Sequence, residues 1–149
     1  MTTDTLSKPP TGTSPCVQDL VKARITLFHC CNALGSTSLL QLKNDACEIQ
    51  SVTMPCSSMT RELFLLKAFE AGASAVVVLV CPEGTCRYLE GNLRAEKRVA
   101  RVKKLLDEIG LGGQRLNLFN IPHGDQSAVD AIIVQTISDL ATLGPLPVA

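Results

Sequence analysis

Residues 75–86 read AVVVLVCPEGTC, and this stretch decides the fold. The six consecutive apolar residues from Ala75 to Val80 are typical of a strand that is buried on both faces of a parallel sheet. Two thiols, Cys81 and Cys86, follow at the point where that strand ends. Open α/β sheets bind their ligands at the carboxyl ends of the strands. The stretch therefore predicts a parallel sheet with a functional site at its carboxyl edge.

Strand and helix patterns alternate on both sides of this stretch. We expect strands at 24–29, 48–54, 75–80 and 115–121, and helices at 36–42, 60–71, 92–109 and 127–143. This alternation predicts βαβ units, and their crossovers are right-handed. We therefore expect one α/β domain with a four-stranded parallel sheet, helices on both faces and a flavodoxin-like strand order of 2-1-3-4.

The two middle helices carry apolar residues at helical spacing. Asn92 is the expected N-cap of the second of them, and Gly72 is expected to stop the first. The residues expected to face the core are Leu63, Leu66 and Phe69 in the first helix, and Val99, Val102, Leu106 and Ile109 in the second.

Length and composition suit a single globular domain. The chain has 149 residues, and we expect a flexible tail over 1–22, which is rich in Pro, Thr and Ser, followed by the folded domain over 23–145. The net charge of zero and the 3% aromatic content argue against nucleic-acid binding. The sequence shows no membrane span and no secretory signal pattern, so we expect a cytoplasmic protein.

Seven cysteines in a reducing compartment indicate metal or redox chemistry rather than disulfides. Four of them follow predicted strands, and parallel strands share one carboxyl edge, so their thiols are expected to meet. Four thiolates suit an iron–sulfur cluster or a structural zinc. Cys30 and Cys31 are alternatives for one position, because neighbouring residues of a strand point in opposite directions. The four candidates are Cys31, Cys56, Cys81 and Cys86, and Cys16 and Cys47 are expected to be bystanders.

A second chemistry could use some of the same residues. Cys81, Gly84 and Arg87 match the cysteine–loop–arginine pattern of phosphatase-like enzymes, in which a thiolate attacks phosphate and the arginine binds it. In that pattern the loop leads directly into a helix, whereas here the helix is expected only at Asn92. The pattern also leaves Cys31 and Cys56 unexplained.

The sequence also resembles a known family, the delta (D) subunit of methyl-viologen-reducing hydrogenase, from about residue 25 to about residue 140. The resemblance rests on Cys30-Cys31-Asn32, on Pro55-Cys56-Ser57, on the segments 66–73 (LKAFEAGA) and 80–88 (VCPEGTCRY), and on Glu90-Gly91-Asn92 with 95–99 (AEKRV). It implies a small subunit that carries a [2Fe–2S] cluster, whose ligands correspond to Cys31, Cys56, Cys81 and Cys86.

The same resemblance implies a role and partners. The subunit would pass electrons between a hydrogenase, formate dehydrogenase or methylenetetrahydrofolate reductase module and a heterodisulfide-reductase A-type flavoprotein subunit. The family usually has Cys-Asn-Trp-Cys after the first strand, whereas this chain reads Cys31-Asn32-Ala33-Leu34. If the missing thiol is a ligand in the family, Cys30 or Cys47 would have to replace it. The alternative is a subunit of the same complex that has lost its cluster. The basic residues of helix 92–109 are expected to form a solvated face or a docking surface for an acidic partner.

Overall fold

The computed structural model describes residues 22–34 and 47–147. The expected helix at 36–42, Cys16 and almost all of the predicted tail lie outside these residues. Within them, no helix is both long and apolar enough to cross a membrane. The strands are β1 (Ala23–Cys30), β2 (Cys47–Met54), β3 (Ala75–Val80) and β4 (Leu116–Asn120), the α-helices are α1 (Glu62–Glu70), α2 (Gly91–Glu108) and α3 (Gln126–Leu143), and the 3-10 helices are η2 (Ser57–Met59) and η3 (Gly113–Arg115).

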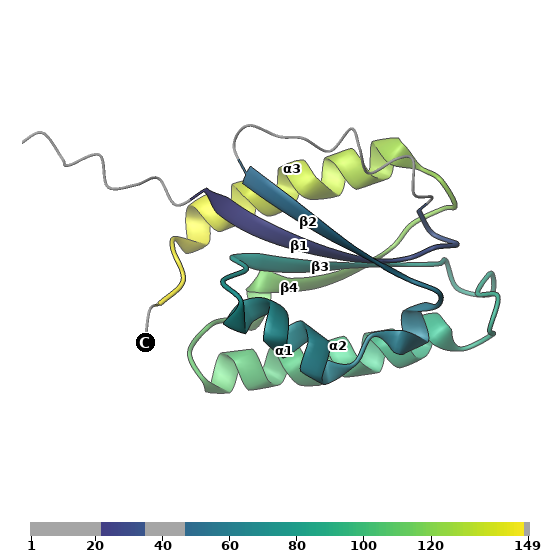
Figure 1. Ribbon diagram of the computed structural model, residues 1–149, viewed down its shortest axis with the longest axis horizontal. Coiled ribbons are helices and arrows are strands. Elements are labelled where there is room, and N and C mark those ends of the chain that lie inside the picture. The colour runs from purple at the N-terminus through teal and green to yellow at the C-terminus, as the bar shows by residue number, and fades with distance from the viewer. Residues whose placement is uncertain (1–21, 35–46, 148–149) are drawn as a thin grey trace, which may run out of the picture.

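The four strands form one parallel sheet in the order β2-β1-β3-β4, as the sequence predicted. In the register of the sheet, Ile25 of β1 lies beside Ile49 of β2 and beside Ala75 of β3. Every strand therefore ends at the same edge, on the right of Figure 1, where α2 also begins. This edge is where the predicted thiol site has to be sought.

Helices cover both faces of the sheet, which makes a three-layer sandwich (Figure 1). One face packs against α3, with Ile25, Val77 and Ile133 in its core. The other face packs against α1 and α2, with Val78, Leu65 and Val102 in its core. β3 is buried along its whole length, because it lies inside the sheet and is covered on both faces.

Helix α1 differs from its predicted form in where it begins and in which face it buries. The expected start at Thr60 is occupied by the end of η2, and the α-helix begins at Glu62. Leu65 and Phe69, one turn apart, face the core, whereas Leu63 is 56% exposed. Similarly, Ile109 is exposed because it caps the end of α2 beyond the last buried turn.

Arg115 ties the end of the chain to the sheet. Its side chain is buried and, among the residues that the structure describes, hydrogen-bonds to backbone carbonyls, and burial lowers its pKa. A guanidinium offers five donors in a rigid fork, so one side chain can bond several carbonyls. Its acceptors are the carbonyls of Leu111 (3.1 Å), Ser74 (3.2 Å), Gly144 (2.9 Å), Pro145 (3.2 Å) and Leu143 (3.5 Å).

We predict that Arg115→Met lowers the free energy of unfolding by about 2–4 kcal/mol, because it leaves several buried carbonyls without a charged donor. Arg115→Lys should recover little, since an ammonium cannot bond carbonyls on several sides. Arg101→Met is the control, because Arg101 forms only an exposed ion pair with Glu62, worth less than about 1 kcal/mol. Urea unfolding measures all three, and equal losses for Arg115→Met and Arg101→Met would contradict the assignment.

Candidate functional site: a cluster of buried thiols

Four buried cysteines meet at the carboxyl edge of the sheet. Cys30 is the last residue of β1, Cys56 lies two residues after β2, Cys81 follows β3 directly, and Cys86 lies in the loop between β3 and α2. They belong to one contiguous cluster of buried residues, and each is between 1% and 7% exposed. All four are free thiols. We call these four residues the thiol cluster.

The first pair within the thiol cluster joins two neighbouring strands. The Sγ atoms of Cys81 and Cys30 are 3.8 Å apart. Two thiolates on one tetrahedral metal, with metal–sulfur bonds of about 2.3 Å, are separated by about 3.8 Å. The side-chain amide of Asn32 donates a hydrogen bond to Cys81 Sγ at 3.4 Å. This pair therefore already has the spacing of two ligands on one metal ion.

The second pair, Cys56 and Cys86, gathers around Gly91, the first residue of α2. A Cβ atom at position 91 would lie 2.5 Å from Cys56 Sγ, which is closer than atoms pack, and 3.1 Å from Cys86 Sγ, which is tighter than most contacts of a Cβ atom. A side chain at residue 91 would therefore push both sulfurs away, and only glycine leaves room for them.

The start of α2 favours a negative charge on Cys86. Burial by itself raises the pKa of this thiol, but hydrogen bonds from the backbone N–H groups of Tyr88, Asn92 and Gly91, with one from Cys56, bring it below its ordinary value. The first N–H groups of a helix have no partner within the helix and carry its positive end. They supply the N–H donors that a thiolate ligand requires.

Cys81 has the opposite electrostatic environment. Burial raises the pKa of its thiol, and the nearby Cys30 and Cys86 raise it further, although the Asn32 amide opposes them. A group of thiols without a metal resists ionisation because several negative charges in an apolar site repel one another. A bound cation would remove this penalty, because it neutralises the thiolates that coordinate it.

Side-chain amides fix the loop that carries Cys81. The amide of Asn120, at the end of β4, donates to the Cys81 carbonyl at 2.9 Å. Asn92 was predicted to cap α2, but the N-cap position belongs to Glu90. The Asn92 amide instead donates to the carbonyls of Cys81 and Pro82, both at 3.3 Å. The residue predicted as a helix cap thus joins α2 to the thiol cluster.

The other cysteines and histidines that the structure describes lie apart from these two pairs. Cys31 is exposed, and its thiol donates to the Pro55 carbonyl at 3.3 Å. Cys47 starts β2 and so lies at the amino edge of the sheet. His29 is buried in β1 and bonds to Thr53 at 3.0 Å. His123 is exposed and bonds to the Asn32 carbonyl. The structure therefore brings Cys30, and not the exposed Cys31, beside Cys81.

The arrangement in pairs limits the chemistry of the site. Across residues 22–34 and 47–147, no three His, Cys, Asp or Glu side chains lie together so that they could hold one metal ion. A phosphatase-like role for Cys81 is also disfavoured, because a thiolate nucleophile needs a lowered pKa and Cys81 has a raised one. Arg87, which would bind the phosphate, is exposed.

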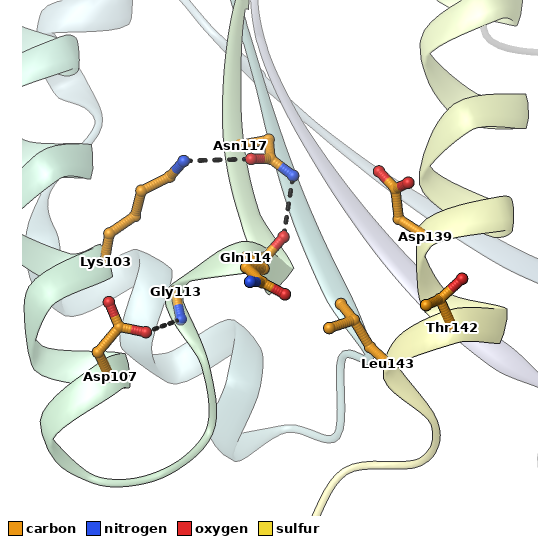
Figure 2. A pocket seen from close by; sticks show the side chains of 8 residues that line it. All are labelled: Lys103, Asp107, Gly113, Gln114, Asn117, Asp139, Thr142 and Leu143. Atoms are coloured by element: carbon orange, nitrogen blue, oxygen red, sulfur yellow. Dashed lines mark hydrogen bonds between the residues drawn. The ribbon is translucent and has the colours of Figure 1, made fainter.

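A separate cavity of about 590 Å³ lies near the amino end of β4, between the carboxyl ends of α2 and α3 (Figure 2). Most of the residues that line it are polar, and several of them hydrogen-bond to one another. Lys103 donates to Asn117 at 3.1 Å, and the Gly113 backbone N–H donates to Asp107 at 2.6 Å. No cysteine lines it. Neither its position nor its chemistry links it to the thiol cluster.

Gly91 and Ser57 stand in segments that carry the family resemblance, but sequence reasoning missed the space that Gly91 leaves and the buried hydroxyl of Ser57. Ser57 is fully buried, and its Oγ would lie 3.4 Å from a Cβ at position 91. Glycine weakens the helical conformation, so a glycine that opens a long helix was the available signal for the first. For the hydroxyl the sequence held no comparable signal, since serine after Pro-Cys is typical of an ordinary turn.

We predict that in the metal-free protein Cys86, whose pKa is lowered, ionises at a lower pH than Cys81 and Cys47, whose pKa values burial raises. Thiolate absorbance followed against pH should lose a step at low pH in Cys86→Ser, whereas Cys47→Ser should keep that step. Because Cys86 has a lower pKa in the folded than in the unfolded chain, its contribution to stability is present at alkaline pH and is lost as the pH falls through the folded pKa. An absorbance curve that keeps this step in Cys86→Ser would contradict the role of the α2 N–H groups.

Comparison with known proteins identifies one family and several relatives that are similar to this chain. The family described as methyl-viologen-reducing hydrogenase, delta subunit, matches residues 26–144. The chain is 34% identical over 114 residues to the D-type iron-sulfur subunit of the F420-non-reducing hydrogenase vhu of Methanocaldococcus jannaschii, which covers 76% of this chain and 83% of the relative. The corresponding protein of Methanococcus maripaludis is 31% identical over 115 residues, covering 77% and 84%.

A relative of a different kind is much longer. The A-type subunit of the ferredoxin:CoB-CoM heterodisulfide reductase of Methanosarcina mazei is 31% identical over 98 residues, which is 66% of this chain but only 12% of that protein. The similar region is thus one small part of a larger subunit. The match over 26–144, the parallel sheet and the D-type relatives agree, and the chain belongs to the family of the methyl-viologen-reducing hydrogenase delta subunit.

Proposed function

We propose that this protein is an electron-transfer subunit that holds a [2Fe–2S] cluster through Cys30, Cys56, Cys81 and Cys86. The observation that carries the proposal is the arrangement of four buried thiols in two pairs, one of them with sulfurs 3.8 Å apart. The resemblance to the family implied Cys31 as a ligand. We take Cys30 in its place, because Cys30 is buried beside Cys81 whereas Cys31 is exposed.

The paired arrangement favours a binuclear cluster over a single zinc ion. A structural zinc needs four ligands around one point, and the described residues offer no such group. A [2Fe–2S] cluster takes two thiolates on each iron, which matches one pair from Cys30 and Cys81 and a second from Cys56 and Cys86. The glycine at 91 and the N–H groups that face Cys86 suit ligands that carry negative charge.

When bound, a [2Fe–2S] cluster supplies a centre that accepts and releases one electron. The protein's own part is to hold the thiolates, exclude water and set the reduction potential through hydrogen bonds to sulfur. Asn32 and the backbone N–H of Ser58 donate to the sulfurs of Cys81 and Cys56, both at 3.4 Å. Such donors stabilise the more negative, reduced state and raise the potential.

The proposed partners are an A-type subunit of heterodisulfide reductase and an electron-donating module. The names of the relatives support both kinds of partner, since some relatives are iron–sulfur subunits of hydrogenases and others are A-type subunits of heterodisulfide reductases. In the latter, the similar region is part of the longer chain, which supports close contact between this domain and an A-type subunit. For the donor module, we propose a hydrogenase, a formate dehydrogenase or a methylenetetrahydrofolate reductase.

An apolar surface beside the thiol cluster, formed by Met59, Tyr88 and Leu89, supports docking of a partner protein at this edge. We call this surface the rim. A cavity of about 560 Å³ has Cys56 and Gly91 among its lining residues, together with Met59, Tyr88 and Leu89. Leu89 is 84% exposed and has a φ of 63°, a conformation that is strained for a leucine. Strain and apolar exposure at one residue are typical of a functional surface rather than of a fold-stabilising one.

Basic side chains extend this rim along α2, which suits a partner with acidic residues around an apolar contact. Arg94 and Lys97 are exposed, and Arg94 pairs only weakly with Glu90, at 3.6 Å. Arg98 has a structural role instead, because it donates to the carbonyls of Ser58 and Thr60. The docking surface we propose therefore comprises Met59, Tyr88, Leu89, Leu93, Arg94 and Lys97.

We predict that Cys30→Ser lowers the iron and acid-labile sulfide content of the anaerobically purified protein, whereas Cys31→Ser and Cys47→Ser leave it near the wild-type value. The reason is that Cys30 is buried beside Cys81, whereas Cys31 is exposed and Cys47 lies at the amino edge of the sheet. Loss of iron in Cys31→Ser, with iron retained in Cys30→Ser, would overturn our choice of ligand. A wild-type protein without iron that still binds its partner would favour the alternative of a cluster-less interaction subunit.

We also predict that Leu89→Gly weakens binding to a heterodisulfide reductase A-type subunit by about 10-fold, as expected for a central apolar contact. Glycine tolerates a positive φ, so this variant should be no less stable than the wild type. Val134→Ala, at an exposed position on α3, is the matched control. Titration calorimetry measures binding, and unchanged affinity in Leu89→Gly would place the docking surface elsewhere.

A further inference from the structure

One buried polar group near the thiol cluster has no partner. The hydroxyl of Ser57 is completely buried, and it finds no hydrogen-bond partner among the residues that the structure describes. Buried hydroxyls are nearly always hydrogen-bonded, because an unpaired one forfeits its bonds to water without replacement. An alanine would fill almost the same space without this cost. The hydroxyl therefore calls for an explanation other than packing.

The position of the hydroxyl points to the thiol cluster. Around the place where a Cβ of residue 91 would be, the nearest atoms are the sulfurs of Cys56 and Cys86, at 2.5 Å and 3.1 Å, and the Oγ of Ser57, at 3.4 Å. The Ser57 hydroxyl thus shares the space left by Gly91 with the second thiol pair. It therefore borders the same space as the two sulfurs that we propose coordinate one iron.

The segment that carries Ser57 is held in place from both sides. Ser57 begins the short helix η2, whose N-cap is Cys56 and whose Thr60 N–H bonds to the Ser57 carbonyl at 3.0 Å. From α2, Arg98 donates to the carbonyls of Ser58 and Thr60. A donor fixed in this way keeps its orientation when the charge on a neighbouring group changes.

We propose that the Ser57 hydroxyl donates a hydrogen bond to a sulfur of the bound [2Fe–2S] cluster and raises its reduction potential. The inference rests on the proposed function, and it assigns to Ser57 the role of a positioning and tuning residue. Reduction adds one electron to the centre, so its sulfurs become more negative and accept a stronger hydrogen bond. A donor in a dry site therefore stabilises the reduced state more than the oxidised state.

The test compares Ser57→Ala with Ser138→Ala, a control of the same substitution at an exposed position of α3, in cluster-loaded and in metal-free full-length protein. In loaded protein, Ser57→Ala should shift the midpoint potential to a more negative value, and an exchangeable proton coupled to the reduced centre should disappear from its pulsed-resonance spectrum. Ser138→Ala should leave both unchanged.

In metal-free protein, Ser57→Ala should have an unfolding temperature equal to or above that of the wild type, because it removes an unpaired buried hydroxyl. A purely structural role predicts the reverse, with a loss of stability in metal-free protein and no shift in potential, and that result would overturn the proposal. If the wild-type protein binds iron and sulfide but Ser57→Ala has the same potential, the role of Ser57 is refuted and the proposed function is not. Wild-type protein without a cluster refutes the proposed function itself.

Discussion

The parallel pairing of β1, β2 and β3 is the constraint on which the rest of the structure depends. A cysteine lies at the end of each of these strands or within two residues after it, and only a parallel sheet brings all three ends to one edge. Burying β3 between α3 on one face and α1 and α2 on the other supplies the apolar free energy that holds this geometry. The position of the thiols is thus a consequence of the same packing that stabilises the fold.

Helix α2 adds the electrostatic part of the site. Its first residue, Gly91, leaves room for two sulfurs, its first N–H groups lower the pKa of Cys86, and Asn92 bonds to the loop after β3. Cys81, with its raised pKa, shows the cost of crowding thiols in an apolar site when no cation is bound. A site that favours one thiolate and opposes another is suited to a metal centre, which neutralises the set as a whole.

Much of this could be predicted from the sequence, because strand burial and helix periodicity are local signals. The run Ala75–Val80 and the alternation around it predicted four parallel strands in the observed order. The choice between Cys30 and Cys31 could not be predicted, since it depends on which way the last residue of β1 turns. The face of α1 was missed because its start is set by η2. The role of the Ser57 hydroxyl and the space left by Gly91 were missed because both arise from a contact between segments that are distant in the chain.

The central claim is that paired thiols from separate loops coordinate two irons. X-ray absorption at the iron edge of anaerobically purified wild-type protein tests it most directly. The account predicts an inner coordination sphere composed of sulfur alone and a second iron as the nearest metal neighbour. Nitrogen or oxygen bound directly to iron, an iron without an iron neighbour, or zinc as the bound metal would contradict it.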